Sequence, residues 1–180
     1  EKKMVNKKPD FGPIRPHLTA GATAVGAREV LVALNCTLST QDVSIARSLA
    51  GQIREFQRVR RGSDGVIRER QSLGLPGLRA LGWFSGRDGL AQVTMNLTNT
   101  LEAPPHKVFE RLNALCAEQG IEIVGSELVG MIPRGLLEAA GAFFEPESSQ
   151  SLAAGIRGLK LGVMHAFDPK ERILEHVLSQ

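Results

Sequence analysis

The sequence predicts an α+β fold, and three observations lead to this class. The first is a strand pattern at 90–98 (LAQVTMNLT), where apolar and polar residues alternate. The second is a pair of helical patterns at 41–60 and 104–119, where apolar residues recur every three to four positions. The third is the element order β-α-β-β-α-β followed by further helices, which is the order of a ferredoxin-like sandwich with additional C-terminal helices.

Composition limits the classes of protein that fit. The chain has 180 residues, 42% hydrophobic and 23% charged, which is typical of a soluble globular protein of one or two domains. No apolar run approaches the roughly 18 residues of a membrane span, so we expect no membrane partner. A net charge of +3 is too small to indicate nucleic acid, and stacking aromatics are scarce because Tyr is absent and Trp occurs once. We therefore expect no nucleic-acid partner.

The two cysteines, Cys36 and Cys116, both lie in apolar patterns. Neither has a Cys or His neighbour at metal-ligand spacing, so we expect buried free thiols and no metal site. Two observations predict a reducing, cytoplasmic location: the thiols are expected to be free, and the sequence starts at Glu1 without an apolar leader. The missing initiator Met leaves open whether the chain is a fragment or a stand-alone subunit.

The first half of the chain begins with a Gly/Pro-rich segment at 1–27, which cannot form a regular helix. A strand is predicted at 28–38, followed by the helix at 41–60 with Ser39 as its N-cap and arginines in its last turns. Its apolar stripe consists of Ile45, Leu49, Ile53 and Phe56. The segment 62–77 reads as a basic loop.

The second half contains strands at 78–84 and 90–98 joined by a turn at 85–89. The helix at 104–119 opens on prolines, and a strand starts at 121–125. A short helix follows Pro133 with Leu136, Leu137, Ala140 and Phe143 inside, and a weaker one crosses 151–161. Asp168 caps the last helix. The predicted division is 1–27 as linker and ligand loop, 28–145 as the ferredoxin-like unit and 146–180 as a helical extension.

One face of the predicted sheet is polar and uncharged. The alternation places five side chains on it: Asn35, Thr37, Gln92, Thr94 and Asn96. Amides and hydroxyls suit hydrogen bonding to a ligand or to a second sheet, and a solvated outer face is the alternative. The topology is shared with RNA-recognition domains, but the central strand lacks the aromatic residues on which those domains stack bases.

Other candidate residues are weaker. An arginine-rich stretch could bind phosphates or carboxylates, or form a solvated surface; it comprises Arg54, Arg58, Arg60, Arg61, Arg68 and Arg70. Among His17, His106, His165 and His176 no two have metal-ligand spacing, and His17 alone lies in a plausible ligand loop. Ser126 and Glu127 stand at a strand end without a partner base in sequence.

Eight runs in order resemble the C-terminal subdomain of glutamate formiminotransferase. They are PDFGP (9–13), GATAVGAR (21–28), VALN (32–35), LGW (81–83), AQVTMNLT (91–98), VFE (108–110), GSELVGMIP (125–133) and FDPKERILE (167–175). The resemblance implies transfer of a formimino group from N-formimino-L-glutamate to tetrahydrofolate in histidine degradation. It also implies two ferredoxin-like subdomains with facing sheets, so that the N-terminal subdomain is a partner, and we expect a homo-oligomer.

In that family the loop after PDFGP contributes to the folate site. Carried over by position, its residues here are Gly12, Pro13, Ile14, Arg15, Pro16, His17, Leu18, Thr19, Ala20 and Gly21. Glycines there allow close backbone approach, and Arg15 can pair with a folate carboxylate. Asn35, Gln92 and Asn96 are the second group of candidates.

The family's catalytic histidine belongs to the N-terminal subdomain, so we assign no catalytic residue in this chain. The alternatives are a non-catalytic folate-binding or interaction module, and a relative that transfers formyl groups. The segment 62–77 is longer and more basic than the family's usual connection, which leaves its role open.

Overall fold

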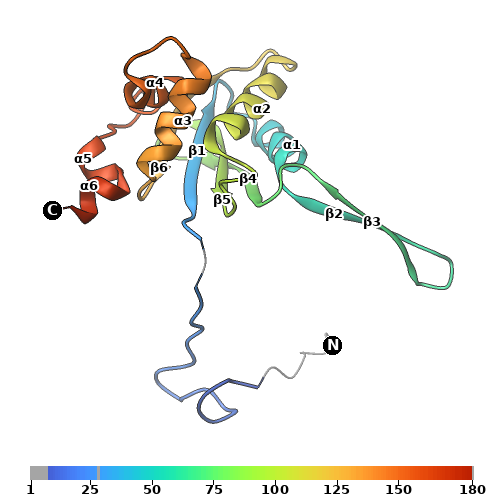
Figure 1. Cartoon of the computed structure of the whole chain (residues 1–180). Helices are drawn as coiled ribbons and strands as arrows, with labels where there is room; N and C mark the ends of the chain where they lie inside the picture. The colour runs from blue at the N-terminus through green and yellow to red at the C-terminus, as the bar shows by residue number, and fades with distance from the viewer. Residues whose placement is uncertain (1–7, 28, 180) are drawn as a thin grey trace.

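The computed structural model describes residues 8–27 and 29–179 (Figure 1). The elements in chain order are β1 (Val32–Leu38), α1 (Val43–Ile53), β2 (Phe56–Arg61), β3 (Ile67–Leu73), β4 (Leu78–Ser85), β5 (Leu90–Leu97), α2 (Pro105–Ala117), β6 (Ile123–Val129), α3 (Arg134–Phe144), α4 (Ser151–Gly158), α5 (Pro169–Arg172) and α6 (Leu174–Leu178). This mixture confirms the α+β class.

The main sheet has four strands in the order β4-β5-β1-β6, and all three pairings are antiparallel. Its centre is the β1–β5 ladder, in which Cys36 lies opposite Val93 and Asn35 lies opposite Thr94. A separate antiparallel hairpin, β2–β3, projects from the body (Figure 1).

The predicted faces of the central strands are confirmed. One face is fully buried and contains Val32, Leu34, Cys36, Leu38, Ala91, Val93, Met95 and Leu97. The helix α1 packs against β4 and β5, and α2 packs against α1 and α3. Buried side chains of α1 and α2 belong to the same hydrophobic cluster as this sheet face. Strict alternation fixed the register, because a slip of one residue would have turned every side chain over.

The predicted helix at 41–60 is wrong in its second half. The helix α1 ends at Ile53, because Arg54 takes an extended backbone conformation. Phe56 and the following arginines form β2 instead, paired with β3, which replaces residues 67–73 of the predicted loop at 62–77. Strand pairing supplies hydrogen bonds that a local helical pattern cannot anticipate. The side chains of Arg61, Arg68 and Arg70 lie outside the described set.

Three smaller predictions are also corrected. Asp42, not Ser39, caps α1, since its carboxylate accepts from the Ser44 N–H. Phe143 is 41% exposed rather than inside, and its ring stacks on His106. The last helix starts at Asp168 as predicted but splits into α5 and α6, because Ile173 takes an extended conformation and is fully buried.

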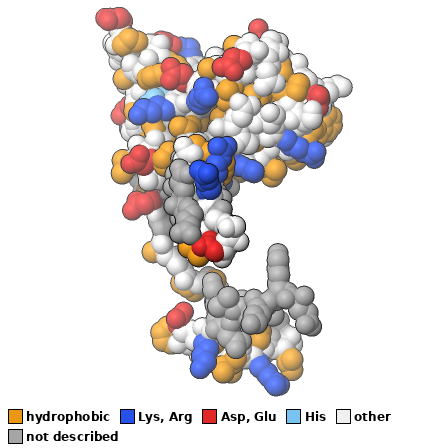
Figure 2. All heavy atoms as spheres, turned by 90° about the vertical axis from the view of Figure 1, so that its right-hand side faces the viewer, with side chains coloured by type: hydrophobic (Ala, Val, Ile, Leu, Met, Phe, Trp, Pro, Cys, Tyr) orange, Lys and Arg blue, Asp and Glu red, His pale blue; other side chains and the backbone are white. Residues whose placement is uncertain are grey.

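The described part of the N-terminal segment, 8–27, is exposed and runs away from the start of β1 (Figure 1). Figure 2 shows it standing clear of the body. Its large apolar side chains face solvent: Phe11, Ile14, Leu18 and Val25. The strand predicted at 28–38 starts too early, because β1 begins at Val32; Arg28 itself lies outside the described residues.

Candidate functional site

The open face of the sheet carries more than amides and hydroxyls. Asn35, Thr37, Gln92, Thr94 and Asn96 lie on it as predicted, but register adds two charged residues. Glu127 of β6 lies opposite Asn35, and Arg79 of β4 lies opposite Asn96. The prediction of an uncharged face is therefore wrong. It considered only the two central strands, and the edge strands β4 and β6 add charged side chains to the same face.

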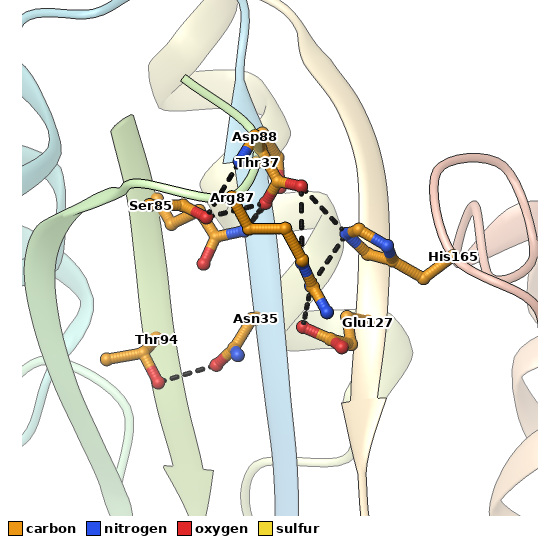
Figure 3. Close-up of polar contacts among 9 residues, drawn as sticks. Asn35, Thr37, Ser85, Arg87, Asp88, Thr94, Glu127 and His165 are labelled. Carbon is orange, nitrogen blue, oxygen red and sulfur yellow. Dashed lines mark hydrogen bonds and ion pairs between the residues drawn. The ribbon is translucent and has the colours of Figure 1, made fainter. Parts of the chain in front are cut away.

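A buried carboxylate organises one end of this face. Asp88, in the β4–β5 turn, has a side chain that is 4% exposed. Its Oδ2 accepts a hydrogen bond from Ser85 Oγ at 2.7 Å (Figure 3). The same oxygen accepts a second hydrogen bond from Gln92 Nε2 at 2.8 Å. Gln92 Nε2 also donates to Thr37 Oγ1 at 2.8 Å. These donors compensate the cost of burying the charge.

Two further groups join this end of the sheet. Arg87 Nη2 donates to Glu127 Oε2 at 2.9 Å and lies 2.8 Å from His165 Nε2 (Figure 3). His165 Nε2 is also 3.1 Å from Asp88 Oδ1. The hydrogen bond to Glu127 is the main reason that the pKa of Arg87 is raised. We call Arg87, Asp88, Glu127 and His165 the ionic cluster.

The segment after α4 brings His165 to the cluster. The Ser126 N–H donates to the Lys160 carbonyl, and Leu161 forms a bridge with Ser126 at the edge of β6. The chain then turns at Gly162, where φ is +82°. A hollow forms here, lined by Arg87, Ser126, Glu127, Leu128, Leu161, Gly162, His165, Ala166, Phe167 and Arg172.

The 12–21 loop is a compact turn. His17 and Gly21 exchange two backbone hydrogen bonds of 3.0 and 2.9 Å, and His17 Nδ1 accepts from the Ala20 N–H at 3.1 Å. Gly12 and Gly21 have positive φ, +86° and +69°, which L side chains adopt only with strain. His17 therefore shapes its own turn through Nδ1.

The structure does not bring the two predicted groups together, since the 12–21 loop stands away from the sheet (Figure 1). On the sheet the candidates also separate. Asn35 is 9% exposed, and its Oδ1 accepts a hydrogen bond from Thr94 Oγ1 at 2.5 Å. Gln92 is 1% exposed and lies beneath the ionic cluster. Asn96 is exposed and lines a different hollow with Arg79 and Glu29.

The remaining candidates have structural roles or lie on the surface. Burial raises the pKa of Cys36 to about 12 and that of Cys116 to about 11, so neither is a nucleophile at neutral pH. Both are free thiols, as predicted. Desolvation lowers the pKa of His106, whose ring packs on Phe143. Within the described residues no group of three or more His, Cys, Asp or Glu side chains is placed to hold a metal ion.

Sequence reasoning missed Arg87, Asp88 and His165 as site residues. Arg87 is 40 positions from Glu127 and 78 positions from His165, so no local spacing connects them. The available signals were the charged pair in the SGRDG turn and Glu127 at a strand end. Both became informative only when the strand order placed β4, β5 and β6 in one sheet.

An antiparallel sheet with helices on one face and a polar, partly ionic open face defines an α+β domain with a surface suited to a ligand or a partner. Among the described helices, none has the length and apolar character to span a membrane. A family model for the formiminotransferase domain matches residues 33–179. The chain belongs to this formiminotransferase domain family.

Named relatives agree with the family match. The chain is 34% identical to a formimidoyltransferase-cyclodeaminase of Dictyostelium discoideum over 96% of its own length and 32% of the relative's. It is 35% identical to the Mus musculus protein of that name over 94% of its length and 31% of the relative's. A glutamate formimidoyltransferase of Streptococcus pyogenes serotype M1 is 33% identical over 77% of this chain and 42% of the relative. The chain thus spans about a third to two fifths of these relatives.

Proposed function

We propose that this chain is the folate-binding half of a glutamate formimidoyltransferase. In this proposal the enzyme transfers a formimidoyl group from N-formimino-L-glutamate to tetrahydrofolate in histidine degradation. The observation that supports it most is the family match over 33–179, together with a polar sheet face opposite the apolar face on which α1 and α2 pack. The names of the relatives supply the reaction type.

The proposal extends to architecture and partners. With the β2–β3 hairpin set aside as an insertion, the order β1-α1-β4-β5-α2-β6 is that of a ferredoxin-like unit. An N-terminal subdomain would lay its own sheet against the open face, where Leu81, Trp83 and Val129 are between 45% and 59% exposed. The same proposal includes a homo-oligomer and a cytoplasmic location. It also includes the division of the chain into 1–27, 28–145 and 146–180.

The 12–21 loop is the proposed folate contact. Its two positive-φ glycines let backbone N–H groups approach a ligand, and Arg15 supplies a cation for a folate carboxylate. The loop is exposed and apolar at Ile14 and Leu18, which suits a segment completed by a ligand or a second subdomain. Asn35 and Asn96 are the proposed secondary contacts, and Gln92 would act through Asp88.

Turnover by the chain alone distinguishes the proposed function from its alternatives. Mixed with tetrahydrofolate and N-formimino-L-glutamate, this chain should give no product above background, because no catalytic base is assigned to it and such a base contributes about 10²–10⁴-fold. Adding the N-terminal subdomain of a relative should restore transfer. We call the chain combined with that subdomain the assembled enzyme. If it binds folate but transfers no formimidoyl group, a non-catalytic module is favoured.

Replacing Arg15 by alanine tests the loop. If Arg15 meets a folate carboxylate, folinate binding to the assembled enzyme should weaken by about 1.5–3 kcal/mol in calorimetry. A distant surface charge would change it by less than about 1 kcal/mol, and high salt would remove that difference. Unchanged affinity after joint replacement of Arg15, His17 and Thr19 would exclude side chains of this loop from the site.

A further inference from the structure

Glu127 is a carboxylate on the open face that can accept more hydrogen bonds than its neighbours supply. It lies opposite Asn35 in the β1–β6 ladder, and its side chain is 25% exposed. It lines the hollow at the ionic cluster together with Arg87 and His165. Figure 3 shows the three side chains next to one another. A partly exposed carboxylate beside a hollow is accessible to a small ligand and is also held in position by its neighbours.

The two oxygens of Glu127 differ in their partners. Oε2 accepts from Arg87 Nη2 at 2.9 Å, and Oε1 has no hydrogen-bond partner in the described part of the chain. An ionised carboxylate accepts about four hydrogen bonds over its two oxygens. Arg87 therefore fixes the carboxylate and leaves one oxygen for a second cation.

The chemistry of the proposed donor matches this oxygen. A formimidoyl group on an amine nitrogen is an amidine, which is protonated at neutral pH. The resulting amidinium is a planar, delocalised cation that presents N–H donors, as a guanidinium does, and such cations pair with carboxylates. The guanidinium of Arg87 on Oε2 shows that Glu127 accepts a cation of this shape. A formyl group on the same nitrogen is a neutral amide and gains no ion pair.

We propose that Glu127 binds the amidinium of the formimidoyl donor and makes the site select formimidoyl over formyl donors. Arg87 is a positioning residue, because it holds Oε2 of Glu127. This inference rests on the proposed function and adds a residue and a chemical basis for donor choice.

The test is Glu127→Gln in the assembled enzyme, since glutamine keeps the shape and removes the charge. The KM for N-formimino-L-glutamate should rise about 10- to 100-fold, the range for a hydrogen bond to a charged group. The inhibition constant of N-formyl-L-glutamate should change less than about threefold. The matched control is Glu145→Gln, which removes the ion pair between Glu145, at the C-cap of α3, and Arg157 of α4, and should change neither constant.

Equal losses for both ligands, or no change for either, would overturn the inference. A wild-type enzyme that binds folinate but transfers no formimidoyl group would instead overturn the proposed function, and the inference with it. A second measurement does not depend on the folding of the variant. Formamidinium should shift the backbone amide resonance of Glu127 in the wild-type chain and formamide should not; identical responses would contradict the role of charge.

Discussion

At the scale of single residues, Asp88 illustrates how a buried charge is accommodated. Its carboxylate is almost fully covered, yet Ser85 and Gln92 donate to it and His165 lies within 3.1 Å. A buried carboxylate without such donors would cost several kcal/mol. Asp88 thus ties the β4–β5 turn to β5 and to the segment after α4, and it helps to place Arg87 beside Glu127.

The cysteines give a residue-scale prediction of reactivity and pH dependence. Because burial raises the pKa of Cys36 to about 12 and of Cys116 to about 11, the native thiols should resist a disulfide reagent at pH 8. Labelling should follow global unfolding, with both sites reacting in denaturant. The measurement is mass spectrometry of the native chain over time.

The raised pKa values of the two thiols also determine how the stability of the fold changes with pH. Both folded-state pKa values are raised above the ordinary thiol value of 9.0, so the thiols' contribution to stability is complete below pH 9. It is lost as pH rises from 9 towards the folded values, because the unfolded chain ionises first. Replacing Cys36 by serine should reduce this alkaline loss; an unaltered alkaline slope would contradict the assignment.

At the scale of elements, close packing of α1 on the sheet depends on a glycine in β4. A Cβ at Gly82 would overlap the backbone of Ala46 and Arg47 in α1. The crossing of α3 and α4 uses the same device, since a Cβ at Gly141 or Gly155 would overlap the backbone of the other helix. In both places the absence of a side chain allows two backbones to approach.

Gly82→Ala should therefore destabilise the fold by about 1–3 kcal/mol, the usual cost of overpacking, because backbone atoms cannot move aside. Gly51→Ala is the matched control. Gly51 lies inside α1 with open space around its Cβ direction, so alanine there should stabilise by about 0.5–1 kcal/mol. Urea unfolding of both variants measures the two free energies, and a stabilised Gly82→Ala chain would contradict the close packing of α1 on β4.

At the scale of the whole molecule, the two ends of the chain differ in how they relate to the core. Residues 8–27 are exposed, whereas Leu159, Leu161 and Ile173 belong to the main hydrophobic cluster. Ile132 and Ile173 form a bridge that joins the residue between α5 and α6 to the connection between β6 and α3. The packing of the C-terminal segment therefore contributes to the stability of the fold.

Two truncations test this asymmetry. Removing residues 1–27 should leave the free energy of unfolding within about 0.5 kcal/mol, as for surface changes, while weakening folate binding. Removing residues 159–180 deletes three buried side chains and should cost more than about 4 kcal/mol. Thermal unfolding followed by circular dichroism compares the two. A large loss from the first truncation would show that the segment packs on the body.

Local sequence determined the elements whose pattern is strong and whose neighbours lie close by. The alternation at 90–98 fixed the faces of β5, and the prolines and Asp168 marked helix starts at α2 and α5. The buried thiols followed from the same patterns. These features depend on steric and hydrogen-bonding preferences within a few residues, so the sequence alone is sufficient.

Tertiary structure decided the features that depend on contacts between distant residues. The stretch 56–61 became a strand because it pairs with β3, although its local pattern continued a helix. Glu127 acquired partners because β6 lies beside β1, and His165 reached the cluster through the segment that follows α4. Strand order and side-chain neighbours across a sheet are set by long-range pairing, and no spacing along the chain records them.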